Sequence, residues 1–250
     1  MLHTAEIRVM LSAAFKEAYL ELVPQFERAT GHKVTPLWIP TLEMMRRLKE
    51  GDVVDVVILS APPMAELTAA GVIAPGSSVN LATCGVGVAV KAGAPKPDLS
   101  SGDALKRAVL AARSIVYSHG PSGIYLAGLF ERMGIADEIR HKVTRVQGQP
   151  AGEIVAQGDA EIGFQQVCEL LPIPGIDLVG PLPPDVQEIT TFTAGVHAKA
   201  KQPEAAQALL KFLTSPEAAP IIRQKGMEPV STGKSQRGER SVNPQRIKGA

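Results

Sequence analysis

The first 71 residues alternate short apolar runs with longer amphipathic ones, and this alternation constrains the fold most. Three runs predict strands because they are short, apolar and rich in β-branched residues: residues 7–11, 33–39 and 53–59. Helical spacing follows each of them, over residues 13–30, from 41 to 51, and from 61 to Gly71. A strand–helix order repeated three times predicts the α/β class, with a mostly parallel sheet and right-handed crossovers.

The rest of the chain continues the pattern with less regular spacing. Further strands are predicted at residues 84–91, 114–117, 143–146, 161–165, 177–179 and 190–194. Further helices are predicted at residues 103–112, 124–133, 152–157, 203–213 and 215–225. With 250 residues, the chain is long enough for two lobes, each with its own core.

Charge and hydropathy exclude several classes of partner. A net charge of +1 provides no global field that would attract nucleic acid, so no nucleic-acid partner is expected. No apolar run approaches the roughly 18 residues of a membrane span. The first residues lack the features of a signal peptide, which leaves two readings open: the signal has been removed, or the protein stays in the cytoplasm.

The last twenty residues form a basic tail. Five basic residues stand there against one acidic residue, Glu239, without aromatic residues or helical periodicity: Lys234, Arg237, Arg240, Arg246 and Lys248. Such a composition predicts a disordered, solvated tail over residues 231–250.

The two cysteines, Cys84 and Cys168, make neither a disulfide framework nor a metal-binding pattern. Each lies in an apolar run, so we expect two buried free thiols. We expect no metal and no cofactor.

Three turns share one design, in which a strand ends, a hydroxyl residue follows and a helix begins. They carry Ser12, Thr41 and, in the turn 118–123, Ser122. In an open parallel sheet these turns lie at the carboxyl edge, where helix N-termini present free N–H groups to anions. Two interpretations stay open: the hydroxyls are ordinary helix N-caps, or they form a shared anion site.

Other polar residues complete the candidate ligand-binding set. These are Ser60 before the third helix, Ser118, His119 and Gly123 of the glycine-rich turn, and Gln165 and Gln166 after a strand. His119 could titrate near neutrality, and Gln166 could donate to a carboxylate. Asp55 lies in an apolar strand, where a hydrogen-bonded structural carboxylate is favoured over a cation ligand.

Enzyme signatures are absent from the sequence: there is no P-loop, GxGxxG, GxSxG or HExxH motif and no Cys/His metal cluster. Their absence weakens an enzyme interpretation without removing it. A proton-transfer isomerase needs only a base, an acid and groups that hold an anion, so no catalytic residue is assigned from motifs.

Several segments together resemble the molybdate-binding-protein-like branch of the type 2 periplasmic binding proteins. The resemblance covers about residues 5–230 and rests on residues 26–34, 51–60, 87–95, 158–164 and 212–218. It implies two Rossmann-like lobes joined by a two-strand hinge, with lobe I from residues 1–82 plus 194–230 and lobe II from 83–193. It also implies a periplasmic monomer that closes around a small anion and delivers it to an ABC transporter permease.

The resemblance also implies ligand contacts. Ser12 matches the first oxyanion-binding position, Thr41 approximately matches the second, and Ser122 matches the turn of lobe II. Residues 149–152 occupy the place of a further backbone donor. Trp38 and the pair Gln165–Gln166 depart from the oxyanion pattern, which favours a small organic carboxylate over molybdate.

Two other functions stay open. Aconitate-isomerase-like enzymes resemble the same branch, and in such an enzyme His119, Glu169 or Tyr125 would move a proton on a small tricarboxylate. A cytoplasmic anion sensor that regulates a partner is the third hypothesis.

Overall fold

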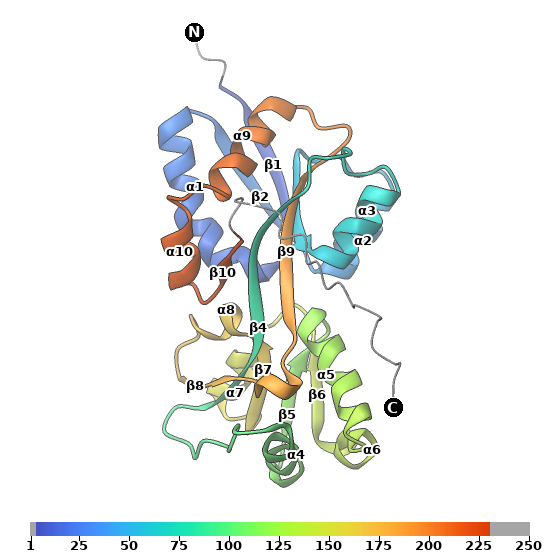
Figure 1. Cartoon of the computed structure of the whole chain (residues 1–250), viewed down its shortest axis with the longest axis vertical. Helices are drawn as coiled ribbons and strands as arrows, with labels where there is room; N and C mark the ends of the chain where they lie inside the picture. The colour runs from blue at the N-terminus through green and yellow to red at the C-terminus, as the bar shows by residue number, and fades with distance from the viewer. Residues whose placement is uncertain (1–3, 231–250) are drawn as a thin grey trace, which may run out of the picture.

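A computed structural model describes residues 4–230, which form two lobes stacked along the long axis of the molecule (Figure 1). The predicted tail, residues 231–250, lies outside the described residues. One continuous ten-stranded sheet runs through both lobes, and eight of its strands follow the order β2-β1-β3-β9-β4-β7-β5-β6. The predicted α/β class is confirmed.

Lobe I contains three parallel strands and one antiparallel neighbour. The strands are β1 (Glu6–Leu11), β2 (Lys33–Trp38), β3 (Val56–Ser60) and the antiparallel β9 (Ile189–Val196). The helices are η1 (Ala13–Phe15), α1 (Lys16–Thr30), α2 (Thr41–Lys49), α3 (Ala61–Ala69), α9 (Pro203–Leu213) and α10 (Ala219–Gln224). A short strand, β10 (Glu228–Pro229), pairs with β4.

Lobe II is built in the same way on a second set of parallel strands. The strands are β5 (Ile115–Ser118), β6 (Val143–Val146), β7 (Ile162–Gln166) and β8 (Ile176–Pro181). The helices are α4 (Gly102–Ala111), α5 (Pro121–Arg132), α6 (Ala136–Ile139), η2 (Arg140–Lys142), α7 (Ala151–Gln157), α8 (Val167–Leu170) and η3 (Pro184–Val186). Strands β6, β5 and β7 are parallel neighbours.

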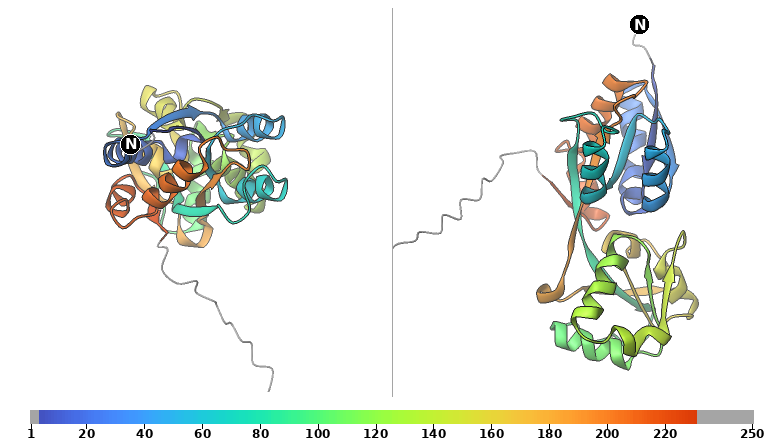
Figure 2. Two further views of the ribbon diagram at one scale, coloured as in Figure 1. Left: turned by 90° about the horizontal axis from the view of Figure 1, so that it is seen from above. Right: turned by 90° about the vertical axis from the view of Figure 1, so that its right-hand side faces the viewer.

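Two long strands connect the lobes. Strand β4 (Val79–Lys91) pairs with β9 through residues 79–85 and then with β7 and β8 through residues 86–91. The two crossing strands run along one side of the molecule (Figure 2). The predicted two-strand connection is therefore present. The change of partner on β4 falls between Gly85 and Val86, and the predicted lobe limits stay a prediction.

The apolar strands of lobe I are covered on both faces, which explains why they read as continuous apolar runs. On β3, Val56 and Ile58 join the larger core under α1 and α9, whereas Val57 and Leu59 join a second core under α2 and α3. Side chains alternate between the two faces with a period of two. Lobe II has its own apolar core, built between its sheet and helices α4 and α5.

Two predicted helices begin differently in the structure. The segment predicted as one helix over residues 13–30 starts as the 3-10 turn η1 before α1 begins at Lys16. The helix predicted over 215–225 begins only at Ala219, because Pro220 lacks an N–H and fits only the first turn of a helix.

Asp55 is a buried carboxylate that accepts several backbone hydrogen bonds in lobe I. Its carboxylate accepts from the backbone N–H groups of Arg8 (2.8 Å), Lys201 (2.8 Å) and Gln202 (2.9 Å). These bonds tie β1 and the entry of α9 to the start of β3. The structural interpretation of this residue is confirmed, and it lies at the opposite end of β3 from Ser60.

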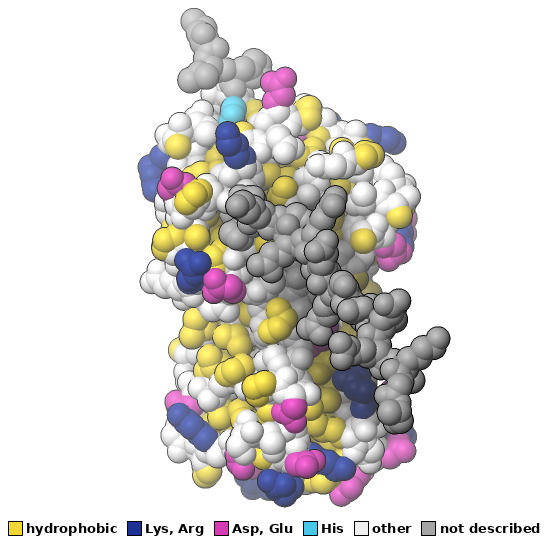
Figure 3. Space-filling view, viewed as in Figure 1, with side chains coloured by type: hydrophobic (Ala, Val, Ile, Leu, Met, Phe, Trp, Pro, Cys, Tyr) yellow, Lys and Arg dark blue, Asp and Glu magenta, His cyan; other side chains and the backbone are white. Residues whose placement is uncertain are grey.

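The visible surface carries both signs of charge. Acidic and basic side chains are interspersed over the lobes in the space-filling view (Figure 3). Within residues 4–230, no helix has the length and apolar character that crossing a bilayer requires.

Candidate functional site

The carboxyl edges of the two parallel sheets face one another. In lobe I, η1, α2 and α3 follow the carboxyl ends of β1, β2 and β3, which are parallel. In lobe II, α5 and α8 follow the carboxyl ends of the parallel strands β5 and β7. Helix α8 contacts η1 of lobe I, and Figure 1 shows α8 at the end of lobe II that is next to lobe I. The edges that bind ligands in open α/β sheets thus meet between the lobes.

Three hydroxyl residues stand at helix starts in lobe I, two of them at N-cap positions. Ser12 and Ser60 occupy the N-cap positions of η1 and α3, and Thr41 is the first residue of α2. A serine at an N-cap normally accepts a bond from the second or third N–H of the helix. Neither serine forms this bond, and the N-cap of α2 is Pro40, which has no side-chain acceptor, so no side chain caps these three helix starts.

Ser122 lies near a helix start in lobe II. It is the second residue of α5, whose N-cap is Gly120, and it is only 2% exposed. Ser101 shows the contrast, because it is a true N-cap whose Oγ accepts from the N–H of Ala104 at 3.1 Å. The Ser122 hydroxyl is thus in a buried residue and makes no bond to its own helix, whereas the Ser101 hydroxyl caps α4.

The turn that carries Ser122 is tightly packed. The Ser118 hydroxyl accepts from the N–H of Gly120 at 3.2 Å, and the N–H of His119 donates to the Val146 carbonyl at 3.0 Å. A Cβ atom at Gly123 would lie 1.6 Å from the Ser118 carbonyl oxygen, so only glycine fits there. Ser118 and Gly123 therefore shape the turn, while the imidazole of His119 is half-buried beside it.

The two glutamines after β7 have different partners. The side-chain oxygen of Gln165 accepts from the N–H of Ala151 at 2.8 Å, and its amide nitrogen donates to Glu169 at 3.0 Å. Gln166 lies against the crossing strands instead. Its amide nitrogen donates to the carbonyls of Cys84 and Gly85, both at 3.1 Å, and its oxygen accepts from the Thr190 hydroxyl at 2.8 Å.

Gln166 is thus engaged by the connection between the lobes, and Gln165 by α7 and α8. Both amides are buried and already hydrogen-bonded.

Glu169 is a half-buried glutamate that the predicted ligand-binding set did not include. Burial raises the pKa of Glu169 from 4.5 to about 7, an effect that the hydrogen bond from Gln165 partly offsets. Its signal in the sequence was weak: a glutamate four residues after Gln165, in a four-residue helix.

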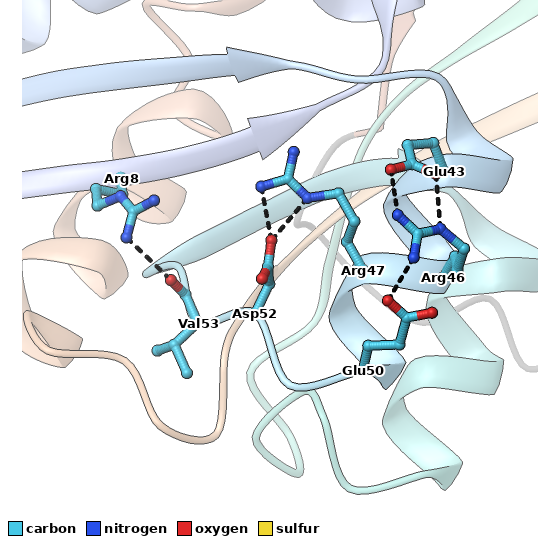
Figure 4. Close-up of polar contacts among 7 residues, drawn as sticks. All are labelled: Arg8, Glu43, Arg46, Arg47, Glu50, Asp52 and Val53. Atoms are coloured by element: carbon cyan, nitrogen blue, oxygen red, sulfur yellow. Dashed lines mark hydrogen bonds and ion pairs between the residues drawn. The ribbon is translucent and has the colours of Figure 1, made fainter.

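The basic residues of α2 are already paired with carboxylates (Figure 4). Arg46 bonds both Glu43 and Glu50, and Arg47 bonds Asp52 at 2.6 Å. The hydrogen bond from Arg46 lowers the pKa of Glu43. These pairs are exposed and contribute little stability.

Large apolar side chains flank the hydroxyl-bearing turns in both lobes. Trp38, at the carboxyl end of β2, is 39% exposed and packs edge-on against Tyr19, with ring centroids 5.4 Å apart. Leu42 follows Thr41 and is 64% exposed, and Ile124 lies near Ser122 and is 60% exposed. Apolar groups thus lie beside the polar ones on each side of the interlobe region.

The two cysteines are free and buried, as predicted. The N–H of Cys168 on α8 points at the sulfur of Cys84 on β4, 3.4 Å away. Cys168 also joins the core of lobe I, so α8 is anchored to that lobe beside the crossing strands.

Comparisons with known proteins agree with this architecture. A sequence profile described as bacterial extracellular solute-binding protein matches residues 7–228. Aconitate isomerase from Pseudomonas sp. is 36% identical over 230 residues, which cover 90% of this chain and 88% of that protein. Molybdate-binding protein ModA from Azotobacter vinelandii is 28% identical over 233 residues, covering 89% of each chain.

A solved structure shows the same fold. The periplasmic molybdate-binding protein of Azotobacter vinelandii superposes with a TM-score of 0.75 at 20% identity, over 88% of this chain and 98% of that one. The two-lobed fold inferred from the resemblance is confirmed. Since the family profile spans nearly the whole described chain, this protein belongs to the bacterial extracellular solute-binding protein family.

Proposed function

We propose that this protein captures a small organic carboxylate between its lobes. One observation carries the proposal: hydroxyl groups stand at helix starts of both lobes. Ser12 and Ser60 hold N-cap positions without a side-chain cap bond, while Thr41 and Ser122 lie in the first turns of α2 and α5, whose N-caps have no side-chain acceptor. Uncapped helix starts and free hydroxyls together offer several neutral donors to an anion.

Donors on both lobes favour closure upon binding. A ligand that contacts Ser12 in lobe I and Ser122 in lobe II makes all its contacts only when the lobes approach. It therefore stabilises the closed arrangement over the open one. The connection through β4 and β9 allows a hinge motion of this kind.

The exposed apolar groups support an organic ligand over a bare oxyanion. Trp38, Leu42 and Ile124 lie next to the polar turns, and ligand sites commonly combine apolar walls with a few placed donors. The 36% identity to an aconitate isomerase supports the same choice, because aconitate is a small tricarboxylate. Delivery to an ABC transporter and a periplasmic location belong to this proposal, and they follow from the family alone.

A thermal-shift screen tests the ligand class. Mono-, di- and tricarboxylates are compared with molybdate, tungstate, sulfate and phosphate. A ligand present at about 100 times its Kd stabilises the folded state by about 2.7 kcal/mol. We expect a clear rise in Tm with at least one carboxylate and none with molybdate. A rise with molybdate alone would contradict the proposal.

A second function, isomerisation of a small tricarboxylate, is favoured by a specific pair of observations. The identity to an aconitate isomerase extends over 90% of this chain, and a titratable carboxyl, Glu169, lies between the two lobes. Conversion of trans-aconitate into cis-aconitate by the purified protein is the test.

A further inference from the structure

Glu169 lies where the two lobes meet. Helix α8 begins directly after the carboxyl end of β7, at the same sheet edge as the turn that carries Ser122. The same helix contacts η1, which begins directly after Ser12. Helix α8 thus follows the sheet edge of lobe II that carries Ser122 and contacts the element of lobe I that follows Ser12.

A short hydrogen-bond chain holds the Glu169 carboxyl in place. The N–H of Ala151 donates to the side-chain oxygen of Gln165 at 2.8 Å, and the Gln165 amide donates to Oε1 of Glu169 at 3.0 Å. Both Ala151 and Gln165 are buried. The amide of Gln165 cannot reverse without breaking both bonds, so it positions one carboxyl oxygen as an acceptor.

The carboxyl has no cationic partner. Among residues 4–230, no lysine, arginine or histidine forms an ion pair with Glu169. The titratable groups that lie beside it are the thiols of Cys84 and Cys168. A partly desolvated carboxyl without a counterion is costly for stability, and such groups concentrate at functional sites.

The other two proton-transfer candidates are less suitable. The Tyr125 hydroxyl donates to the Val186 carbonyl at 2.8 Å, and the guanidinium carbon of Arg132 lies 5.3 Å from the centre of the Tyr125 ring. Both contacts are within lobe II and leave the Tyr125 hydroxyl already hydrogen-bonded. The His119 side chain makes no hydrogen bond within residues 4–230 that would orient it. Of the three, only Glu169 has a side chain that a hydrogen bond orients without using its own donor in the packing of lobe II.

We propose that Glu169 is a proton-transfer residue that moves a proton between two carbons of a bound unsaturated tricarboxylate. This inference rests on the proposed carboxylate binding. The Glu169 carboxylate accepts a proton from the methylene carbon of the ligand, and the electrons of that C–H bond form a new C=C bond to the central carbon.

The electron pair of the original C=C bond then takes a proton at the far carbon. The same carboxyl returns the proton, so composition and oxidation state are unchanged and no co-reactant is required. Hydroxyls and helix N–H groups would hold the carboxylates, where negative charge develops in the carbanion-like transition state. A pKa of about 7 suits a group that must both accept and return a proton near neutral pH.

Solvent deuterium exchange tests the proposal apart from net turnover. Wild-type protein is incubated in D₂O with trans-aconitate, cis-aconitate or saturated tricarballylate, and deuterium at carbon is followed by NMR. Binding is followed separately through Trp38, the single tryptophan of the chain, which lies beside Thr41. We expect all three compounds to bind and only the two unsaturated ones to exchange.

The variant Glu169→Gln should bind with its Kd changed by less than about 10-fold and lose exchange by at least about 100-fold. Glu169→Asp should recover part of the exchange. Glu153→Gln, at an exposed position in the first turn of α7, is the matched control and should exchange like the wild type.

Two negative outcomes are distinguishable. Binding of the tricarboxylates without exchange, or exchange that survives in Glu169→Gln, would overturn the role of Glu169 and leave carboxylate binding intact. Absence of any Trp38 response or thermal shift with every carboxylate would overturn the proposed function itself.

Discussion

Replacement of Glu169 by glutamine should stabilise the protein at pH 8 and leave its stability nearly unchanged at pH 4. Burial raises the pKa of this carboxyl from 4.5 to about 7 in the folded protein. Between pH 4.5 and about 7, Glu169 has lost its proton in the unfolded chain but keeps it in the folded protein. The free energy of unfolding therefore falls as the pH rises through this range. Glutamine does not titrate and escapes this loss.

The size of the effect follows from the shift. Each pKa unit corresponds to about 1.4 kcal/mol, so the difference in unfolding free energy between Glu169→Gln and wild type should grow to about 3 kcal/mol by pH 8. Glutamine also keeps an oxygen that can accept from the Gln165 amide, so the hydrogen-bond chain is retained. The expected gain at high pH is therefore electrostatic in origin.

Urea unfolding, followed by far-UV circular dichroism at pH 4, 6 and 8, measures the difference. Glu153→Gln is the control for loss of a negative charge and should stay within about 0.5 kcal/mol of wild type at pH 8. A Glu169→Gln variant that is as stable as wild type at pH 8, or less stable, would refute the assignment of a raised pKa.

Other predictions concern the packing that supports the site. Asp55→Ala should lower the unfolding free energy by about 3 kcal/mol or more, because three backbone N–H groups lose their acceptor. Asp55→Asn should lower the unfolding free energy by less, and urea unfolding of both variants measures the two effects. Gly123→Ala should cost more than about 2 kcal/mol through its clash with a carbonyl oxygen, whereas Gly128→Ala in the same helix should gain about 0.5–1 kcal/mol, again by urea unfolding. The buried thiols of Cys84 and Cys168 should resist a thiol reagent in the native protein and react when it is unfolded; rapid native labelling would contradict their burial.

The fold could largely be predicted from the sequence, because its strands are buried on both faces and its helices follow them in regular order. The runs at residues 7–11 and 143–146 became β1 and β6 with little or no change in their limits. The start of α10 was missed, since the helical spacing continues across Pro216 and Pro220 and only the missing N–H of Pro220 decides the boundary.

The site was harder to predict from the sequence, because the sequence does not show whether a hydroxyl at a helix start forms a cap bond. Ser101 and Ser122 both stand near a helix start, and only the structure shows that Ser101 is the N-cap of α4 whereas Ser122 is the second residue of α5. The hydrogen-bond partners of Gln166 cannot be predicted from local sequence patterns either, because they come from β4 and β9, which are distant in the sequence. Glu169 owes its raised pKa to the same long-range burial.

Calorimetric titration of single serine variants tests the central claim, that one ligand is held by hydroxyls from both lobes. With the carboxylate that gives the largest thermal shift, Ser12→Ala in lobe I and Ser122→Ala in lobe II should each weaken binding by about 10-fold, the equivalent of one hydrogen bond to a charged group. Ser101→Ala, which removes a true cap, should lower Tm and leave the Kd unchanged. Unchanged affinity in either the Ser12 or the Ser122 variant would contradict a site shared between the lobes.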